Sequence, residues 1–202
     1  MKKYVSDVGF GVPGPVTKEG IIQMNANLGW RNKHVAKELG ELTGLPCMGG
    51  NDVKTAGLGE MWKGGAAEYD NAVFITLGTG VAAAIIVEGK VILGAMGAAG
   101  EIGHIKVDME ETDVCGCGGI GCAEQYASAT GIVKMANRKL AESDKPSVLR
   151  NSEVTSKAGD ALIEVVRKYY KQYVWPGCRD KKFVLAKLGN DAGIYGAASY
   201  VL

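Results

Sequence analysis

The sequence predicts an α/β protein with mixed sheets. Strand-like and helical segments alternate along the chain, which is the pattern of that class. Apolar residues make up 47% of the 202 residues and charged residues 22%, as in globular proteins with a sizeable core. Glycine is abundant, with 30 residues clustered at the ends of apolar runs. Because glycine lets a ligand approach the backbone closely, these clusters indicate loops that wrap small molecules.

Turn residues divide the N-terminal part of the chain into short elements. The run at 5–12 predicts a strand, and the run at 20–24 predicts its partner after an intervening turn. Apolar residues at helical spacing predict a helix over 32–44, with Asn32 as its N-cap and Gly44 as its end.

A short apolar stretch at 45–48 predicts a buried strand that leads into GGND. Asn51 or Asp52 would cap the following helix, which ends at a pair of glycines after residue 63. The apolar run at 71–77 is the clearest strand of the chain, and it delivers the backbone to Gly-Thr-Gly.

The second half of the chain continues the alternation. Residues 81–94 predict two strands joined by a tight turn at Glu88 and Gly89. Residues 122–142 are helical, with a break near Thr130 and Gly131. The remaining elements are an amphipathic helix at 157–174, a strand at 182–188 and a closing helix at 191–202.

Charge and cysteine content exclude several classes of protein. Lys and Arg number 23 against 22 Asp and Glu, so the net charge of +1 gives no sign of a nucleic-acid or membrane surface. No run reaches the roughly 18 apolar residues of a membrane span, and no signal peptide is apparent. Five cysteines, an odd number at irregular spacing, argue against a secreted disulfide framework. We therefore expect a cytoplasmic protein.

Three of the five cysteines lie near a histidine. His104, Cys115, Cys117 and Cys122 are the ligand set of a tetrahedral Cys₃His zinc site, and glycines between the cysteines would let the sulfurs converge. Four protein ligands make such a zinc structural rather than catalytic. A Cys115–Cys117 disulfide would close a strained ring, and no Cys-x-x-Cys redox motif is present. Free cysteines in a glycine loop are the alternative.

The segment GEIGH…CGCGGIGCAE resembles the signature of the ROK family, which comprises bacterial sugar kinases and sugar-responsive repressors. Other stretches extend the resemblance over most of the chain: GFGVPGPV, NANLGW, GGNDVKTAGLGE, FITLGTG and CAEQYASATG. Within the family the sequence is most similar to bacterial glucokinases. The resemblance implies a two-lobed, actin-like (ribonuclease H-like) sugar kinase fold with a structural zinc loop. The small lobe would comprise residues 1–54 and 190–202, and the large lobe residues 55–189.

The resemblance also implies an activity, the ATP- and Mg²⁺-dependent phosphorylation of a hexose, glucose first of all. Family members are dimers or tetramers, so a homo-oligomer is expected. Asp52 would be the general base, and its place at a helix N-terminus suggests a low pKa. The family implies that the sugar is bound by Asn27, Asn51, Asp52, Glu101, His104 and Glu124. His104 would use its second ring nitrogen for zinc.

The strand at 71–77 would present Gly78, Thr79 and Gly80 to a phosphate through backbone N–H groups and a hydroxyl. On local sequence alone, this segment could equally be an ordinary turn, Asp52 a plain helix cap, and Glu101 and Glu124 solvated surface carboxylates.

Three features depart from the family pattern. The Asp-x-Gly-Gly-Thr phosphate loop that opens the family's kinases is missing, and so is the unit for the adenosine near residues 150–156. The run after Gly-Thr-Gly is VAAAII rather than glycine-rich. Either the sequence joins pieces of a longer chain, which its well-patterned segments favour, or the nucleotide site is compromised. The second case would make the protein a non-catalytic sugar binder, either a degenerate kinase or a sugar-responsive regulator.

Overall fold

The strands form one parallel pair and two antiparallel sheets. The computed structural model describes residues 5–25, 28–147 and 159–202. Its strands are β1 (Val8–Val12), β2 (Ile21–Asn25), β3 (Trp30–His34), β4 (Cys47–Asn51), β5 (Ala72–Leu77), β6 (Val81–Val87) and β7 (Lys90–Val91). β1 pairs in parallel with β4, β2 pairs antiparallel with β3, and the third sheet has the antiparallel order β5-β6-β7.

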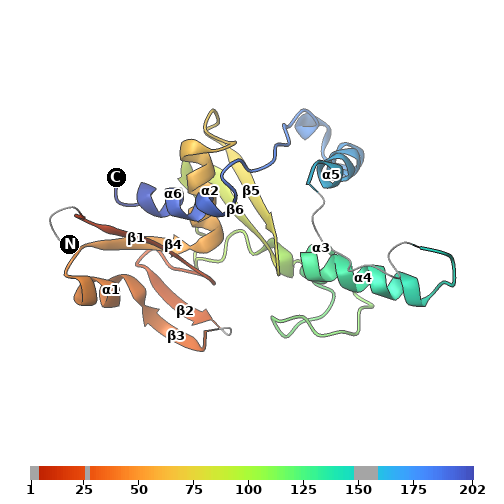
Figure 1. Cartoon of the computed structure of the whole chain (residues 1–202), viewed down its shortest axis with the longest axis horizontal. Helices are drawn as coiled ribbons and strands as arrows, with labels where there is room; N and C mark the ends of the chain where they lie inside the picture. Colours follow the sequence, from red (N-terminus) through yellow and green to blue (C-terminus); the bar gives the residue numbers. More distant parts are fainter. Residues whose placement is uncertain (1–4, 26–27, 148–158) are drawn as a thin grey trace.

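The helices connect and cover these sheets. They are α1 (Val35–Thr43), α2 (Asp52–Lys63), α3 (Glu124–Ala127), α4 (Ala129–Ala141), α5 (Gly159–Tyr173) and α6 (Ala192–Ser199), with 3₁₀ turns η1 (Ile102–His104), η3 (Pro176–Cys178) and η4 (Gly189–Asp191). α2 lies centrally and contacts the β1–β4 pair, the β5–β6 strands and α6 (Figure 1). Its N-terminus follows directly from the end of β4.

A small apolar core holds the N-terminal sheets to α1. Phe10, Val16, Ile22 and Val35 are buried together, and partly buried side chains such as Trp30 pack against them. Trp30 begins β3, a strand whose remaining residues are polar and which gains its stability from pairing with β2. α1 ends at Gly44, whose φ of 67° is the left-handed C-cap conformation that glycine adopts freely.

Glycines allow α2 and α6 to pack backbone against backbone. A Cβ atom on Gly59 would lie 2.1 Å from the Ala192 carbonyl oxygen, and one on Gly196 would lie 1.6 Å from that of Thr55. The Glu60 carboxylate, only 2% exposed, completes this junction by accepting hydrogen bonds from the backbone N–H groups of Lys187 (3.1 Å) and Leu188 (2.8 Å). The C-terminal segment is thus held on α2 by polar contacts as well as by packing.

Most elements expected from the sequence are present, and four details were wrong. The strand at 20–24 pairs with β3 instead of with the first strand, and Asn32 is a strand residue with φ 46° rather than a helix cap. The helical region 122–142 breaks at Ser128, whose hydroxyl accepts a hydrogen bond from the Gly131 N–H (2.9 Å) and so caps α4. Residues 182–188 form no strand, and two of their N–H groups bind Glu60 instead of a neighbouring strand.

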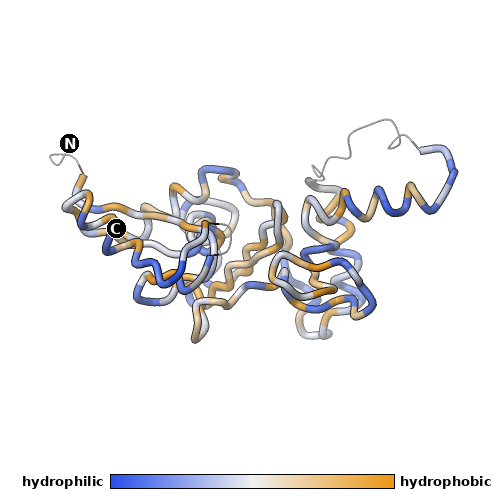
Figure 2. Tube along the Cα trace, turned by 90° about the horizontal axis from the view of Figure 1, so that it is seen from below, coloured by the Kyte–Doolittle hydropathy of each residue, from blue (hydrophilic) through white to orange (hydrophobic). Residues whose placement is uncertain are grey.

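Part of the apolar surface is open to solvent. Val73, Ile75 and Leu77 project from one face of β5 with 62%, 52% and 39% of their surface exposed. On α5 and just beyond it, Tyr173 and Trp175 are 75% and 78% exposed. Figure 2 shows the hydrophobic residues concentrated along the central strands. Faces of this kind normally lie against another element or another chain.

Candidate functional site

The predicted zinc ligands converge. His104 ends η1, Cys115 and Cys117 lie in the glycine loop, and Cys122 precedes α3. The ligand atoms of all four residues lie within 4.8 Å of one another. Cys117 Sγ is 3.6 Å from Cys122 Sγ, and Cys115 Sγ is 3.8 Å from His104 Nδ1. Tetrahedral zinc with Zn–S bonds of about 2.3 Å places neighbouring sulfurs about 3.8 Å apart, so the four residues could hold a zinc ion.

The surroundings of the cluster affect the thiols differently. Burial raises the pKa of Cys115 to about 11, whereas the Gly119 backbone N–H lowers the pKa of Cys117. Lys106 places its ammonium 3.1 Å from Cys122 Sγ and also donates to the Ile120 carbonyl oxygen. The charge of Lys106 also lowers the pKa of Cys117 and so favours its thiolate, the form of cysteine that binds metal.

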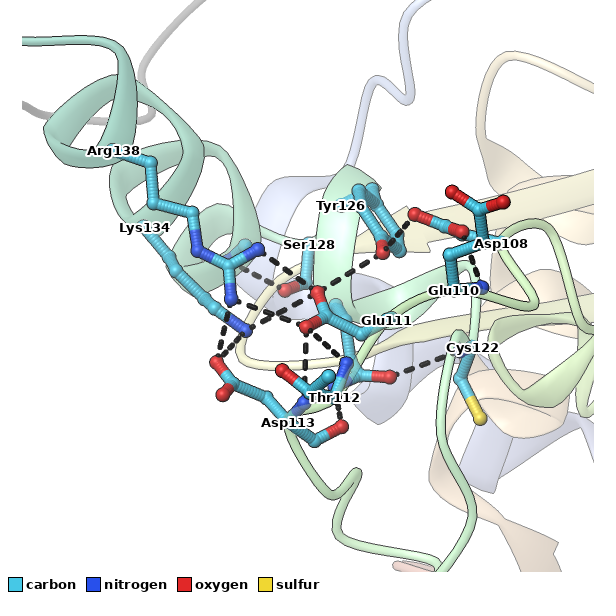
Figure 3. A network of polar contacts seen from close by, with 12 residues as sticks. Asp108, Glu110, Glu111, Thr112, Asp113, Cys122, Tyr126, Ser128, Lys134 and Arg138 are labelled. Carbon is cyan, nitrogen blue, oxygen red and sulfur yellow. Dashed lines mark hydrogen bonds and ion pairs between the residues drawn. The ribbon is translucent and has the colours of Figure 1, made fainter. Parts of the chain in front are cut away.

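A polar network ties the loop that carries Cys115 and Cys117, called the metal loop below, to α4 (Figure 3). Glu111, 6% exposed, accepts hydrogen bonds from both terminal nitrogens of Arg138, at 2.9 and 3.2 Å. Arg138 and Lys134 both reach Asp113, and Tyr126 donates to Glu111 and Asp108. The Arg138 hydrogen bonds hold the pKa of Glu111 far below its usual range. The loop carrying the cysteines is therefore fastened to a helix by charge-assisted bonds.

Asn51 and Asp52 begin α2. The Asn51 side chain is buried; its Oδ1 accepts from the Lys54 N–H (3.1 Å) as the helix N-cap, and its Nδ2 donates to the Gly14 carbonyl oxygen (3.1 Å) and to Asp52 Oδ1 (2.9 Å). Asp52 Oδ1 also accepts from the Val53 N–H (2.9 Å). One carboxylate oxygen of Asp52 is thus fixed, and the side chain remains exposed to solvent.

The expectation of a low pKa for Asp52 was wrong. Removal of its carboxylate from bulk water raises the pKa above the ordinary value, and this effect exceeds the opposing hydrogen bonds from Val53 and Asn51. The side chain is open to solvent on one side, yet surrounding protein displaces enough water to disfavour the charge. A raised pKa makes Asp52 a stronger base than a free carboxylate.

Lys54, on the same helix turn, was not predicted from the sequence. Its side chain is 1% exposed, and Nζ donates to the Gly97 carbonyl oxygen at 2.5 Å. Burial lowers the pKa of Lys54, and the charge of Glu101 opposes that shift. Lys54 thus connects α2 to the loop that ends in Glu101 and His104.

Glu124 lies between the metal cluster and the Gly-Thr-Gly loop. Its Oε2 accepts from the Val81 N–H (3.2 Å), directly after Gly80, and its Oε1 is 3.9 Å from Cys115 Sγ. The loop itself docks on the N-terminus of α4, because Ala129 N–H donates to the Gly78 carbonyl oxygen (2.8 Å) and the Thr130 hydroxyl to that of Thr79 (3.1 Å).

A hollow of about 200 Å³ opens beside this loop. It is lined by Thr79, Val114, Cys115, Gly116, Glu124, Gln125, Ser128, Thr130, Gly131 and Lys134. The lining combines hydroxyls, a helix N-terminus and a lysine, which are groups that suit a phosphate.

The structure therefore gathers the predicted residues into two groups. His104, the three cysteines, Glu124 and residues 78–80 form one group, and Asn51 with Asp52 forms the other. Lys54 connects the two through its hydrogen bond to the Gly97 carbonyl oxygen, in the loop that leads to Glu101 and His104. Asn27 lies outside the described residues. Lys54, Lys106 and Glu111 carry no local motif, so only their distant partners reveal their roles.

Comparison with known proteins gives consistent matches. The model described as "ROK family" matches residues 1–161. A glucokinase of Halalkalibacterium halodurans is 34% identical over an alignment of 249 positions, which covers 96% of this chain and 76% of the glucokinase. Since the chain has 202 residues, at least 47 of the 249 positions have no counterpart in it.

Relatives of two kinds are found. A xylose repressor of Caldicellulosiruptor bescii is 34% identical over 98% of this chain and 48% of the repressor. The crystal structure of a glucokinase from Streptomyces griseus in complex with glucose and AMPPNP superposes with a TM-score of 0.76 and 26% identity, over 96% of this chain and 81% of the other.

Within the residues that the structure describes, none of the helices has the length and apolar character needed to cross a membrane.

Proposed function

Because this chain belongs to the ROK family and has the actin-like α/β fold of the family's sugar kinases, we propose that it phosphorylates a hexose with ATP, glucose being the preferred substrate. The resemblance and the fold class predicted from the sequence are thereby confirmed. The observation that carries the proposed activity is the Asp52 carboxylate, which is oriented by Asn51, exposed at a helix N-terminus and raised in pKa.

Asp52 would accept the proton of the sugar 6-hydroxyl as that oxygen attacks the γ-phosphorus of ATP. The bond from the γ-phosphorus to the bridging oxygen breaks, and ADP leaves with the bonding electrons. In the loose transition state of phosphoryl transfer the alcohol proton departs late, so a carboxylate is a strong enough base. The hydrogen bonds to Val53 and Asn51 hold one carboxylate oxygen and leave the other for the sugar.

The remaining polar residues of the two groups would bind the sugar. Glu101 and Glu124 offer carboxylate acceptors for ring hydroxyls. Asn51 offers only its Oδ1, because both of its side-chain N–H groups already bind Gly14 and Asp52. Asn27 is proposed on the resemblance alone. His104 would hold zinc through Nδ1, the nitrogen near Cys115, and turn Nε2 toward the sugar. The zinc ion would act structurally, by fixing this wall of the pocket with Cys115, Cys117 and Cys122.

The phosphates of ATP would meet residues 78–80 and the neighbouring hollow. Thr79 supplies a hydroxyl there, and the positive end of the α4 dipole faces the same hollow. Mg²⁺ would accompany the nucleotide and neutralise charge on its phosphates. We place the sugar between two lobes, residues 1–54 with 190–202 and residues 55–189. The packing of α6 on β1 supports the assignment of the closing helix to the first lobe.

Replacement of Asp52 by Asn tests the activity. The full-length gene product is assayed with ATP, Mg²⁺ and a panel of hexoses. The amide keeps the size of the carboxylate but cannot accept the proton, so turnover should fall at least ~100-fold. Hexose affinity, measured by calorimetry, should change only modestly. Near-normal turnover in Asp52→Asn would show that another group is the base.

A non-catalytic sugar sensor is the second candidate. A xylose repressor matches 98% of this chain at 34% identity. A sensor would bind a hexose with the same residues and transfer no phosphate. Hexose binding without phosphorylation of any hexose by the full-length unmutated protein would favour this candidate. If the protein neither binds nor phosphorylates a hexose, both the kinase and the sensor are excluded.

A further inference from the structure

The buried ammonium of Lys54 is the feature of α2 that the proposed mechanism leaves unused. Lys54 has the largest side chain among the fully buried residues of the described chain. An ammonium withdrawn from water is unfavourable unless hydrogen bonds and an opposite charge compensate it. An apolar residue would fill the same space without that cost, so the charge itself needs an explanation.

The partners of Lys54 all belong to the loop that precedes His104. Nζ donates to the Gly97 carbonyl oxygen, and the Glu101 charge acts on the ammonium. Gly94, Gly97 and Gly100 have φ values of 74°, 74° and 90°, so glycine permits the turns of this loop. A Cβ on Gly97 would lie 2.4 Å from the Val16 carbonyl oxygen, which shows how closely the loop is packed.

Lys54 also shares its helix turn with the proposed base. Asn51 Oδ1 accepts from the Lys54 backbone N–H, so the residue that orients Asp52 is bonded to the residue that contacts the opposite loop. The Lys54 side chain thus reaches from the first turn of α2, which carries Asp52, to the 94–101 loop, which ends in Glu101. A displacement of either side would change the space between them.

We infer that Lys54 is a positioning residue of the sugar site, whose ammonium holds the 94–101 loop and orients the Glu101 carboxylate toward the sugar hydroxyls. This inference rests on the proposed function. Lys54 does not touch the reacting atoms in this arrangement. It acts through Glu101, and its loss weakens sugar binding without removing the base.

A double-mutant cycle on the full-length protein tests the inference. The variants are Lys54→Met, Glu101→Gln and the two combined, with Lys63→Met as a matched control, because Lys63 is an exposed lysine on the same helix. Calorimetry with glucose gives Kd, and steady-state assays give kcat. Lys54→Met and Glu101→Gln should each raise Kd roughly 10- to 100-fold, as expected when a charged hydrogen-bond partner is lost.

The double variant gives the decisive value. If Lys54 acts through Glu101, the Kd of the double variant should be close to that of Glu101→Gln alone. In Lys54→Met, kcat at saturating glucose should stay within about threefold of the parent value. Lys63→Met should match the parent. Effects on Kd that multiply in the double variant, or a Lys54→Met protein that binds glucose normally, would overturn the inference.

A measurement on protein with Lys54 intact covers the case in which Lys54→Met does not fold. With ¹⁵N-labelled lysine, the buried Nζ signal should shift when glucose is added, and the shift should vanish in Glu101→Gln. An unchanged signal in a protein that binds glucose refutes the role of Lys54 and leaves the proposed function standing. Unmutated protein that binds no hexose refutes the proposed function, and the inference falls with it.

Discussion

At the scale of single residues, the pKa of Asp52 predicts the pH dependence of the activity. The base must be ionised, so kcat/KM should fall as the pH decreases through a pKa that lies above the ordinary aspartate value of about 3.9. The residual rate of Asp52→Asn should lack this acid limb. Its melting temperature should equal or exceed that of the parent, because the folded protein disfavours the charged form. A parent profile that stays flat down to pH 4 would contradict the prediction.

Cys117 is the residue that tests the zinc clamp. Cys117→Ser should lose the metal and lower both the melting temperature and the affinity for glucose, because the clamp supports the wall that carries His104. Elemental analysis should find about one zinc per parent chain and less in the variant. Cys178→Ser is the control, since Cys178 is remote from the cluster and half-buried. Parent protein prepared without chelator and free of zinc would contradict the clamp.

At the scale of elements, α4 and the metal loop depend on one another through Glu111. The folded pKa of Glu111 is depressed, so its contribution to stability is fully present above the unfolded pKa near 4.5 and is lost progressively as the pH falls from there through the folded pKa. Arg138→Met should therefore destabilise the protein most at pH 7 and less at pH 3, where part of the contribution remains because Glu111 in the folded protein is still ionised. Denaturant titration at both pH values measures this.

A neighbouring lysine provides the control for that experiment. Lys139 lies on the same helix, and its partner Glu142 is 61% exposed, as befits a surface pair of little consequence. Lys139→Met should leave stability nearly unchanged at both pH values. An equal loss of stability in Arg138→Met at pH 7 and pH 3 would show that the network does not act through the Glu111 charge.

The elements also show what the sequence could predict. Local chemistry was sufficient at Gly44, at the Glu88–Gly89 turn and at the Asn51 cap, because each depends on a few adjacent residues. The His104–cysteine cluster, which could hold zinc, was recognisable because its four residues lie within 19 positions of the sequence. The strand β3 was not predicted, because it is stabilised by pairing with β2 and has no apolar pattern of its own.

Contacts between residues that are distant in the sequence could not be predicted from it. Lys54 meets a carbonyl 43 residues away, and Glu111 meets an arginine 27 residues away. Neither pair carries a local signal, since buried lysines and glutamates look like surface residues in a sequence. The raised pKa of Asp52 could not be predicted for the same reason, because the desolvation that raises it comes from surrounding segments of the folded chain.

At the scale of the whole molecule, the exposed face of β5 predicts self-association. Val73, Ile75 and Leu77 present apolar surface on a strand at the edge of its sheet. Sedimentation velocity should show species larger than a monomer, increasing with concentration. Ile75→Lys should reduce them without lowering the melting temperature, whereas the same change at exposed Leu42, on α1, should not. A strictly monomeric parent at high concentration would contradict the prediction.

The junction between Glu60 and Lys187 has a consequence for biosynthesis. The two residues are 127 positions apart, and at about 5–20 residues per second a ribosome needs on the order of ten seconds to reach the second after the first. During that interval the Glu60 carboxylate and the glycine-lined face of α2 have no native cover. The nascent chain must therefore keep this surface from wrong partners until α6 emerges, which makes the α2 face a natural place for a molecular chaperone to hold it.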